Sequence, residues 1–371
     1  MADRIARVRV FRQEQPFRDG PYVCSGNRVA LGFTSTVVAI EADDGSTGWG
    51  EMAPLGAFYS EAFPEGVLAG VVALAPSLVG CDARQPAATR RRLDMQMMGQ
   101  PAVKSAIDMA LWDLAARAAD QPLVDYLGGR DGDAVPLYRS ISQDEASRMA
   151  DRARKYIAEG YRRLQIKVGG EPLEDVARVR AVTEAVPAGT VLLADANGGW
   201  TLEAARRFLL GIGEMPIAIE QPCLRYDDCA RLRSHCRQPM ILDESIVTLD
   251  DLLRASSDGT ADGVTIKISR VGGIGPATLM RDVAVARGLM VTVEDTGGAE
   301  IDTAAMTHLS LSTPVANRQH VVDFHNWVTV GHADGMKPTE GGVLRLPDGP
   351  GLGILVRERD LGAPIATFGQ R

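Results

Sequence analysis

Five apolar segments between residues 163 and 270 each end at a charged residue. They read RLQIK, VLLAD, IAIE, MILD and VTIK, and they end at Lys167, Asp195, Glu220, Asp243 and Lys267. Successive charges lie 23 to 28 residues apart, which is the length of one strand and one helix. A charge at the end of a buried strand is costly unless it is paired or used. The feature therefore predicts consecutive strands whose ends meet at one functional site.

The same alternation of strand and helix extends from Pro136 to about Phe324. Eight repeats of it indicate a parallel sheet closed into a barrel with helices outside. An open doubly wound sheet is the alternative, but it would carry a glycine-rich fingerprint after its first strand, and the sequence has none. We therefore expect an α/β fold with a TIM-type barrel of seven or eight β/α units. The strands are expected near 136–141, 163–167, 191–195, 216–220, 239–243, 263–267, 289–294 and 320–324.

The N-terminal third of the chain has a different rhythm. Residues 4–12 alternate with period two, and 33–41 and 47–52 flank a turn-rich joint with an Asp-Gly pair, as in a β-hairpin. Helical patterns follow at 83–98 and 102–118. We expect three parts in order: an α+β capping domain at 1–130, a catalytic barrel at 131–341 and a C-terminal return to the capping domain at 342–371.

Composition excludes several classes of function. The formal net charge of −8 argues against nucleic acid or an anionic membrane as the main partner. The five cysteines include no CxxC pair, which favours a reducing cytoplasm over a disulfide scaffold or a zinc site. The N-terminus lacks the apolar run of a signal peptide, and no stretch approaches the roughly 18 apolar residues of a membrane span. We expect a cytoplasmic protein with a small-molecule partner.

Three of the five strand-end charges are carboxylates on neighbouring strands. The active site of a barrel lies at the C-terminal ends of its strands, so Asp195, Glu220 and Asp243 would share one rim. Carboxylates so close together repel unless a cation neutralises them. Oxygen ligands favour a hard divalent cation, most simply Mg²⁺. The sequence therefore predicts a Mg²⁺ site at this rim.

The two lysines fall on the second and sixth strands, which lie opposite each other in a ring of eight. A carbon acid held between Lys167 and Lys267 could lose a proton to one and receive a proton from the other. A lysine that acts as a base must be neutral, so its pKa should fall from about 10.4 towards the working pH. Burial and a nearby cation both lower a lysine pKa.

Neighbouring residues could support these five. Asn197 and Glu244 adjoin the predicted metal ligands, and we expect them to orient the ligands. Glu294 ends the seventh strand and could support a lysine. A single strand-end Asp is more often a helix N-cap, and a single Lys is more often a surface residue. Only the shared position of all five charges favours a site.

Further residues are candidates for contact with the substrate. Gln165 lies two residues before Lys167 and points to the same side of its strand. Tyr22 and Tyr59 lie in two long loops of the capping domain, which could close over a substrate. Asp295 follows the seventh strand, and Phe324 ends the eighth.

With these residues the sequence resembles the enolase superfamily, in its muconate-lactonizing-enzyme-like subgroup. The resemblance implies that Asp195, Glu220 and Asp243 bind Mg²⁺ and that the two lysines form the acid/base pair around an enediolate. The Lys-x-Lys motif of the subgroup is here Gln165-Ile166-Lys167. The chain has Glu294-Asp295 where the mandelate-racemase branch places a catalytic His, which disfavours that branch.

Several segments are also similar to cis-3-hydroxy-L-proline dehydratases. This resemblance implies dehydration of cis-3-hydroxy-L-proline to Δ1-pyrroline-2-carboxylate by a homo-oligomer. Hydroxyproline-betaine 2-epimerases share LQIK and the opposed lysines, so 2-epimerisation of a proline derivative is the alternative; a barrel that binds metal and a small acid without catalysis is a third possibility. The similar segments are DGPY at 19–22, PLGAFY at 54–59, LYRSISQ at 137–143, LQIKVGG at 164–170, ADANGGW at 194–200, IEQPCL at 219–224 and IKISRVGG at 266–273.

The chain departs from these families after the seventh strand. They tend to have EDTWGGD there, whereas residues 294–300 read EDTGGAE. Quaternary ammonium groups are usually held by aromatic faces, so the missing Trp weakens a betaine substrate.

Overall fold

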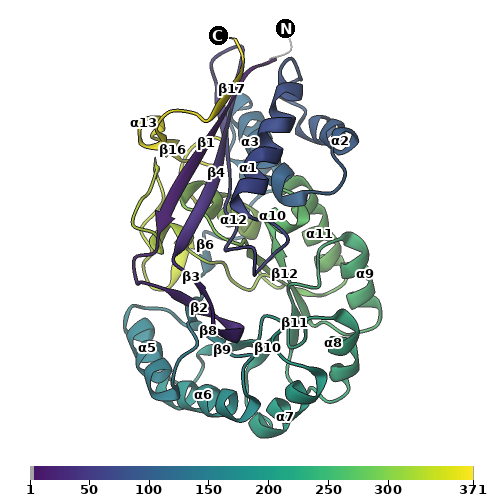
Figure 1. Ribbon diagram of the computed structural model, residues 1–371, viewed down its shortest axis with the longest axis vertical. Coiled ribbons are helices and arrows are strands. Elements are labelled where there is room, and N and C mark those ends of the chain that lie inside the picture. Colours follow the sequence, from purple (N-terminus) through teal and green to yellow (C-terminus); the bar gives the residue numbers. More distant parts are fainter. Residues whose placement is uncertain (1–3, 371) are drawn as a thin grey trace.

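The computed structural model describes residues 4–370, and it contains an antiparallel sheet with helices beside it and a parallel sheet surrounded by helices (Figure 1). The antiparallel sheet has the strand order β17–β1–β4–β5. Its helices cover one face and bury a core of aliphatic side chains from both layers. The elements are β1 (Ile5–Pro16), β4 (Gly32–Ala42), β5 (Thr47–Met52), β17 (Ala366–Gly369), α1 (Pro64–Leu74), α2 (Pro86–Gln96) and α3 (Pro101–Ala118).

Helix α3 lies unusually close to strand β5. A Cβ atom at Gly48 would collide with the backbone oxygen of Ala110, and one at Gly50 would collide with that of Ala106. The two glycines alternate with Trp49, so both face the helix, and only glycine permits this approach.

The last residues of the chain return to the first strand. Strand β17 pairs antiparallel with β1, with Phe368 opposite Val8, so the start of β1 and the end of β17 lie at the same end of the molecule (Figure 1). Strand β15 (Val343–Arg345) pairs with β6 (Ala134–Pro136). The domain boundaries expected at 130 and 341 stay predictions.

The parallel sheet contains seven strands in chain order, which confirms the α/β fold class and the alternation predicted from the sequence. Proline at the first helical position and side-chain caps mark several helix starts, including a capping box at Thr248 and Asp251. The strands are β7 (Arg139–Ile141), β8 (Arg163–Lys167), β9 (Val191–Asp195), β10 (Ala218–Glu220), β11 (Met240–Leu242), β12 (Gly263–Lys267) and β13 (Met290–Glu294). The helices are α5 (Ala146–Ala158), α6 (Pro172–Ala185), α7 (Leu202–Ile212), α8 (Tyr226–Arg233), α9 (Leu249–Ser257), α10 (Ile268–Val271), α11 (Ile274–Ala286) and α12 (Glu300–Leu311).

The eighth position of the barrel differs from the expected strand at 320–324. Two isolated parallel bridges, Val291 with Arg318 and Leu137 with Val321, join this segment to the strands on either side. The apolar run is short, and Asp323 after it is buried and accepts a hydrogen bond from the Tyr161 hydroxyl at 3.1 Å. The ring is therefore closed by bridges rather than by a regular strand.

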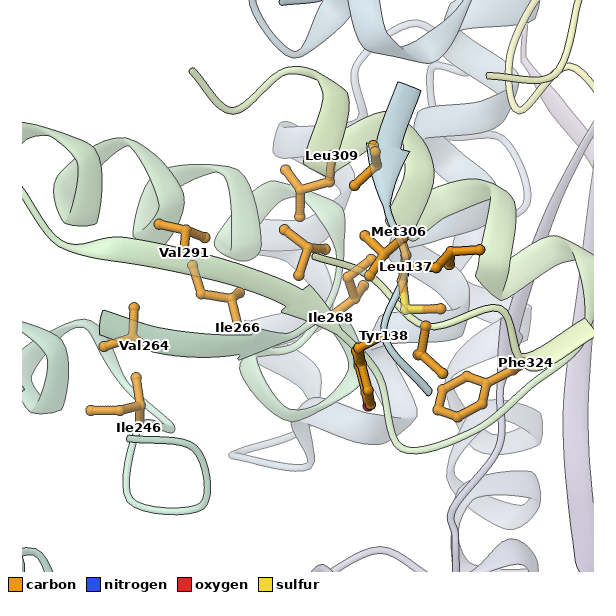
Figure 2. Packing of buried hydrophobic residues seen from close by; sticks show 14 of the residues in the cluster. Leu137, Tyr138, Ile246, Val264, Ile266, Ile268, Val291, Met306, Leu309 and Phe324 are labelled. Carbon is orange, nitrogen blue, oxygen red and sulfur yellow. The ribbon is translucent and has the colours of Figure 1, made fainter. Parts of the chain in front are cut away.

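Helix α12 links the two sheets. All twelve of its residues are buried. On one side Met306 and Leu309 pack towards barrel residues such as Ile266 and Ile268 (Figure 2). On the other side the helix contacts β5 of the antiparallel sheet. Its N-terminus consequently lies where the two parts of the molecule meet.

A short hairpin reaches from the antiparallel sheet to the barrel. It consists of β2 (Tyr22–Cys24) and β3 (Arg28–Ala30) and lies near the ends of β8 and β9 (Figure 1). Ser25 donates a hydrogen bond to the backbone oxygen of Val168, just beyond β8. No helix within residues 4–370 has both the length and the apolar character needed to cross a membrane.

Candidate active site

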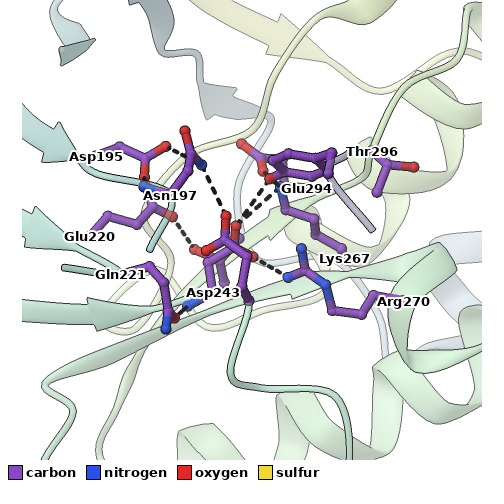
Figure 3. A network of polar contacts seen from close by, with 12 residues as sticks. Asp195, Asn197, Glu220, Gln221, Asp243, Lys267, Arg270, Glu294 and Thr296 are labelled. Atoms are coloured by element: carbon purple, nitrogen blue, oxygen red, sulfur yellow. Dashed lines mark hydrogen bonds and ion pairs between the residues drawn. The ribbon is translucent and has the colours of Figure 1, made fainter. Parts of the chain in front are cut away.

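The five strand-end charges gather at one rim of the barrel. Figure 3 shows four of them, Asp195, Glu220, Asp243 and Lys267. In the sheet register Lys167 lies opposite Asp195, and Asp195 lies opposite Glu220. Asp243 follows β11 directly, and Lys267 ends β12. All five side chains are buried, so their charges must be balanced by one another or by a ligand.

Each of the three rim carboxylates has different partners. Asp195 accepts a hydrogen bond from Lys167. Glu220 accepts from Gln165 Nε2 at 2.9 Å and from Thr265 Oγ1 at 2.8 Å, and both donors are uncharged. Asp243 pairs with Arg270 and lies 3.2 Å from Lys267 Nζ.

These surroundings change the carboxyl pKa values in opposite directions. Burial, followed by the charges of Asp195 and Asp243, raises the pKa of Glu220 well above its usual value. Burial also acts to raise the pKa of Asp243, but Arg270 and Lys267 outweigh it and lower that pKa. Negative charge is therefore poorly compensated at Glu220, which is the middle ligand candidate.

The three carboxylates fit a hard divalent cation by their chemistry. They supply only oxygen and come from adjacent strands, and burial together with their mutual repulsion raises the pKa of Glu220. Within residues 4–370, no three or more His, Cys, Asp or Glu side chains are grouped so that they could hold a metal ion. Asp195 and Asp243 instead form ion pairs with Lys167, Lys267 and Arg270.

Both lysines have raised pKa values, which is opposite to the lowering expected for a base. Burial lowers the pKa of Lys167, but the Asp195 carboxylate outweighs it. For Lys267 burial is likewise outweighed by Asp243 and Glu294, the latter at 2.6 Å. The carboxylates therefore keep both lysines protonated as long as no other cation neutralises them.

A small cavity of about 30 Å³ lies between the two lysines, and both of them line it. All five residues predicted to contact a substrate also line it: Tyr22, Tyr59, Gln165, Asp295 and Phe324. Tyr59 accepts a hydrogen bond from Lys267, and the Lys167 ammonium lies 6.0 Å from the centre of the Tyr22 ring. The capping loops thus provide an aromatic ring beside each lysine.

The three residues predicted to support the site all contact it. Asn197 donates to Asp195 at 3.0 Å and to Glu244 at 3.0 Å, and it accepts from Lys167 at 3.2 Å. Its φ of 44° is in the left-handed region, which Asn adopts more readily than most residues. Glu294 accepts from Tyr138 and pairs with Lys267.

The chain matches two protein-family descriptions that together cover most of its length. Residues 6–128 match "Mandelate racemase / muconate lactonizing enzyme, N-terminal domain", and residues 148–360 match "Enolase C-terminal domain-like". The chain belongs to the enolase superfamily. It is an enzyme of the muconate-lactonizing-enzyme-like group in that superfamily.

Named relatives in this superfamily include a lyase and a racemase. A cis-3-hydroxy-L-proline dehydratase of Roseibium aggregatum is 39% identical, covering 98% of this chain and 100% of that protein. An N-succinyl-L-Arg/Lys racemase of Bacillus cereus is 27% identical, covering 96% and 97%. A solved structure of an enolase-superfamily member from Roseovarius nubinhibens, complexed with magnesium, superposes with a TM-score of 0.93 at 36% identity, covering 99% and 100%.

Four residues of this superfamily enzyme contact the site but were not singled out from its sequence. Thr265 and Arg270 contact Glu220 and Asp243 as described, and Tyr138 contacts Glu294. The Gln221 side-chain oxygen accepts the backbone N–H of Asp243 at 2.9 Å and so fixes the backbone of that residue. Thr265 could have been found, because it precedes Lys267 by two residues as Gln165 precedes Lys167.

The absence of a Trp from the EDTGGAE segment of this superfamily enzyme is explained by an aromatic ring from another strand. A Cβ atom at Gly297 would collide with the Phe33 ring of β4, so that ring occupies the space of a side chain at 297. Phe33 and Phe324 have ring centres 5.3 Å apart, and Phe324 and Trp327 are 5.4 Å apart. The cavity therefore has an aromatic wall although position 297 has no Trp.

Proposed function

We propose that this enzyme is a Mg²⁺-dependent dehydratase that converts cis-3-hydroxy-L-proline to Δ1-pyrroline-2-carboxylate by α-proton abstraction through an enediolate. The observation that carries the proposal is the pair of buried lysines, Lys167 and Lys267, which line one small cavity from strands β8 and β12. The whole-length similarity to a dehydratase of this substrate supports the choice of reaction.

The stereochemistry of this substrate suits two opposed lysines. Its hydroxyl and carboxylate share one face of the ring, and the Cα hydrogen lies on the other face. One lysine removes the Cα proton, and the opposite lysine protonates the hydroxyl as it leaves as water. The resulting enamine tautomerises to the cyclic imine.

Asp195, Glu220 and Asp243 are the residues that would hold Mg²⁺. When bound, the cation would hold the substrate carboxylate and stabilise the negative charge of the enediolate. Gln165 and Thr265 orient Glu220, while Gln221 orients Asp243. The first two hydrogen bonds direct the Glu220 carboxylate, and the third fixes the backbone of Asp243.

The second candidate function is a 2-epimerase or racemase of a proline derivative such as hydroxyproline betaine. The same two lysines would move a proton from one face of Cα to the other. The aromatic wall of Phe33, Phe324 and Trp327 favours this candidate, since aromatic faces hold quaternary ammonium groups. We also propose a cytoplasmic homo-oligomer, and five free cysteines fit a reducing compartment.

Incubation with cis-3-hydroxy-L-proline and Mg²⁺ in D₂O tests the proposal. Formation of pyrroline-2-carboxylate is the expected result. Deuterium at Cα without loss of water would instead favour the epimerase. Neither result across a panel of proline derivatives would contradict both functions. The Lys167→Ala/Lys267→Ala double variant, which lacks both lysines and is incubated in parallel, controls for reaction outside this site.

A further inference from the structure

The hydroxyl group of Tyr138 donates a hydrogen bond to Glu294 beside the reaction cavity. Tyr138 directly precedes β7 and Glu294 ends β13, so the bond joins the two edges of the parallel sheet. The Tyr138 side chain is buried and lines the cavity together with Lys167 and Lys267. A carboxylate has no donor, so the hydroxyl supplies the proton of this bond.

Glu294 divides its two oxygen atoms between Tyr138 and Lys267. Oε1 accepts from the Tyr138 hydroxyl, whereas Oε2 lies 2.6 Å from Lys267 Nζ (Figure 3). Within residues 4–370, the Glu294 carboxylate has no further hydrogen-bond or ion-pair partner. A Glu side chain has three rotatable bonds, so a single contact with the lysine would leave the direction of the carboxylate open. Tyr138 supplies the second contact that fixes it.

The ring of Tyr138 is itself held by the segment that closes the barrel. Its backbone N–H donates to the Val321 oxygen at 3.1 Å, and its ring centre lies 4.8 Å from that of His320. The ring belongs to the buried hydrophobic cluster of the barrel (Figure 2). Burial, followed by the charge of Glu294, raises the pKa of Tyr138 well above its usual value, so the hydroxyl keeps its proton. A protonated hydroxyl is therefore presented to Glu294 from a fixed position.

We propose that Tyr138 is a positioning residue for Lys267, because its hydroxyl holds one oxygen of Glu294 and so directs the other oxygen at the lysine ammonium. The proposal rests on the proposed acid/base role of Lys267, but it does not depend on which substrate is used. The alternative is a purely structural role, since the same bond spans the irregular eighth position of the barrel. A structural role would change stability without a selective loss of kcat.

Steady-state kinetics with cis-3-hydroxy-L-proline compare Tyr138→Phe with Tyr161→Phe, which each remove one hydroxyl and keep the ring. Tyr161 is the matched control: it is buried, its hydroxyl donates to buried Asp323 at 3.1 Å, and it does not line the cavity. We expect Tyr138→Phe to lower kcat by about 10- to 100-fold with KM within about threefold, and Tyr161→Phe to leave both within about threefold. An unimpaired Tyr138→Phe variant, equal losses of kcat in the two variants, or a rise in KM alone would overturn the proposal.

Crystal structures of the wild type and both variants, each grown with Mg²⁺, give a readout that needs no substrate. In Tyr138→Phe we expect Glu294 to turn away from Lys267 or to occupy more than one rotamer, whereas Tyr161→Phe should keep the Glu294–Lys267 pair. An unchanged pair in Tyr138→Phe would overturn the proposal. If the wild type leaves the substrate unchanged, the proposed function fails, and the structures alone decide whether Tyr138 positions Glu294. If Tyr138→Phe does not fold, Tyr138→Met, which also lacks the hydroxyl, replaces it under the same criteria.

Discussion

Lys167 and Lys267 are the same residue type at equivalent strand ends, but their surroundings differ. Lys167 is bonded to Asp195 and Asn197, which both belong to the next strand and the turn after it. Lys267 is bonded to Glu294 and lies close to Asp243, and so has partners from the strands on both sides. It also donates to Tyr59, a residue of the capping loop.

The difference teaches that the capping loops bond directly to Lys267, whereas beside Lys167 they bond to neighbouring groups such as the Val168 backbone oxygen. On the Lys267 side, Tyr59 joins the lysine to the capping loop, and Glu51 of the antiparallel sheet accepts the backbone N–H groups of Ala299 and Asp302 at the start of α12. On the Lys167 side the capping hairpin contributes the ring of Tyr22, whose hydroxyl is bonded to Ser140 at 2.9 Å rather than to a lysine. Lys167 is therefore held mainly by the barrel.

Removal of either lysine tests whether both sides are needed, and it should have the largest effect. Lys167→Ala and Lys267→Ala should each lower kcat by at least about 10³-fold, because each removes a proton-transfer group. Mg²⁺ binding, measured by calorimetry, should be retained. Lys104→Ala is the matched control: this buried lysine pairs with Asp94 at 2.7 Å and does not line the cavity, and turnover should not change. Near-wild-type rates in either site variant would contradict the two-lysine mechanism.

Removal of divalent cations should affect both sides together. Lys167 pairs with Asp195 and Lys267 with Asp243, which are both candidate ligands. We expect a chelator to reduce turnover by about 10²-fold or more and added Mg²⁺ to restore it. Metal content measured by mass spectrometry before each assay is the control. Full turnover by metal-free enzyme would exclude the Mg²⁺ requirement.

Removal of the Tyr59 and Tyr22 hydroxyl groups should affect the two sides of the site to different extents. Both effects should be smaller than those of removing a lysine or the metal. Tyr59→Phe removes a hydrogen bond to the charged Lys267, so we expect kcat to fall about tenfold. Tyr22→Phe removes a bond to Ser140 only and should change kcat by less than about threefold. Both substitutions keep the ring, so each is a control for the other. Equal losses in the two variants would show that the capping loops act alike on both lysines.

Local sequence was sufficient to predict the fold and the positions of the five charges. Each strand from β8 to β12 carries its charge at or just after its own end, so the period of strand and helix places Lys167 and Lys267 without tertiary information. The prediction of a regular eighth strand was wrong. Isolated bridges to Leu137 and Val291 close the ring instead, and buried polar residues such as Asp323 interrupt the apolar run.

The partners of these charges could not be predicted because they come from distant parts of the chain. Tyr59 and Lys267 are separated by 208 residues, and Tyr138 and Glu294 by 156. The aromatic wall was missed for the same reason: the sequence lacks Trp at 297, but Phe33 arrives there from the antiparallel sheet. The predicted fall in the lysine pKa values would require another cation to neutralise the carboxylates. Burial lowers the pKa of Lys167, but the Asp195 carboxylate and other neighbouring groups together raise it by more.

Hydrogen exchange at the substrate Cα by the single-lysine variants tests the two-lysine account most directly. Lys167→Ala and Lys267→Ala are each incubated with cis-3-hydroxy-L-proline and Mg²⁺ in D₂O, and deuterium at Cα is followed by NMR spectroscopy. The variant that keeps the base should still incorporate deuterium without losing water, while the variant that lacks the base should not. Incorporation by both variants, or by neither, would contradict the division of acid and base between Lys167 and Lys267.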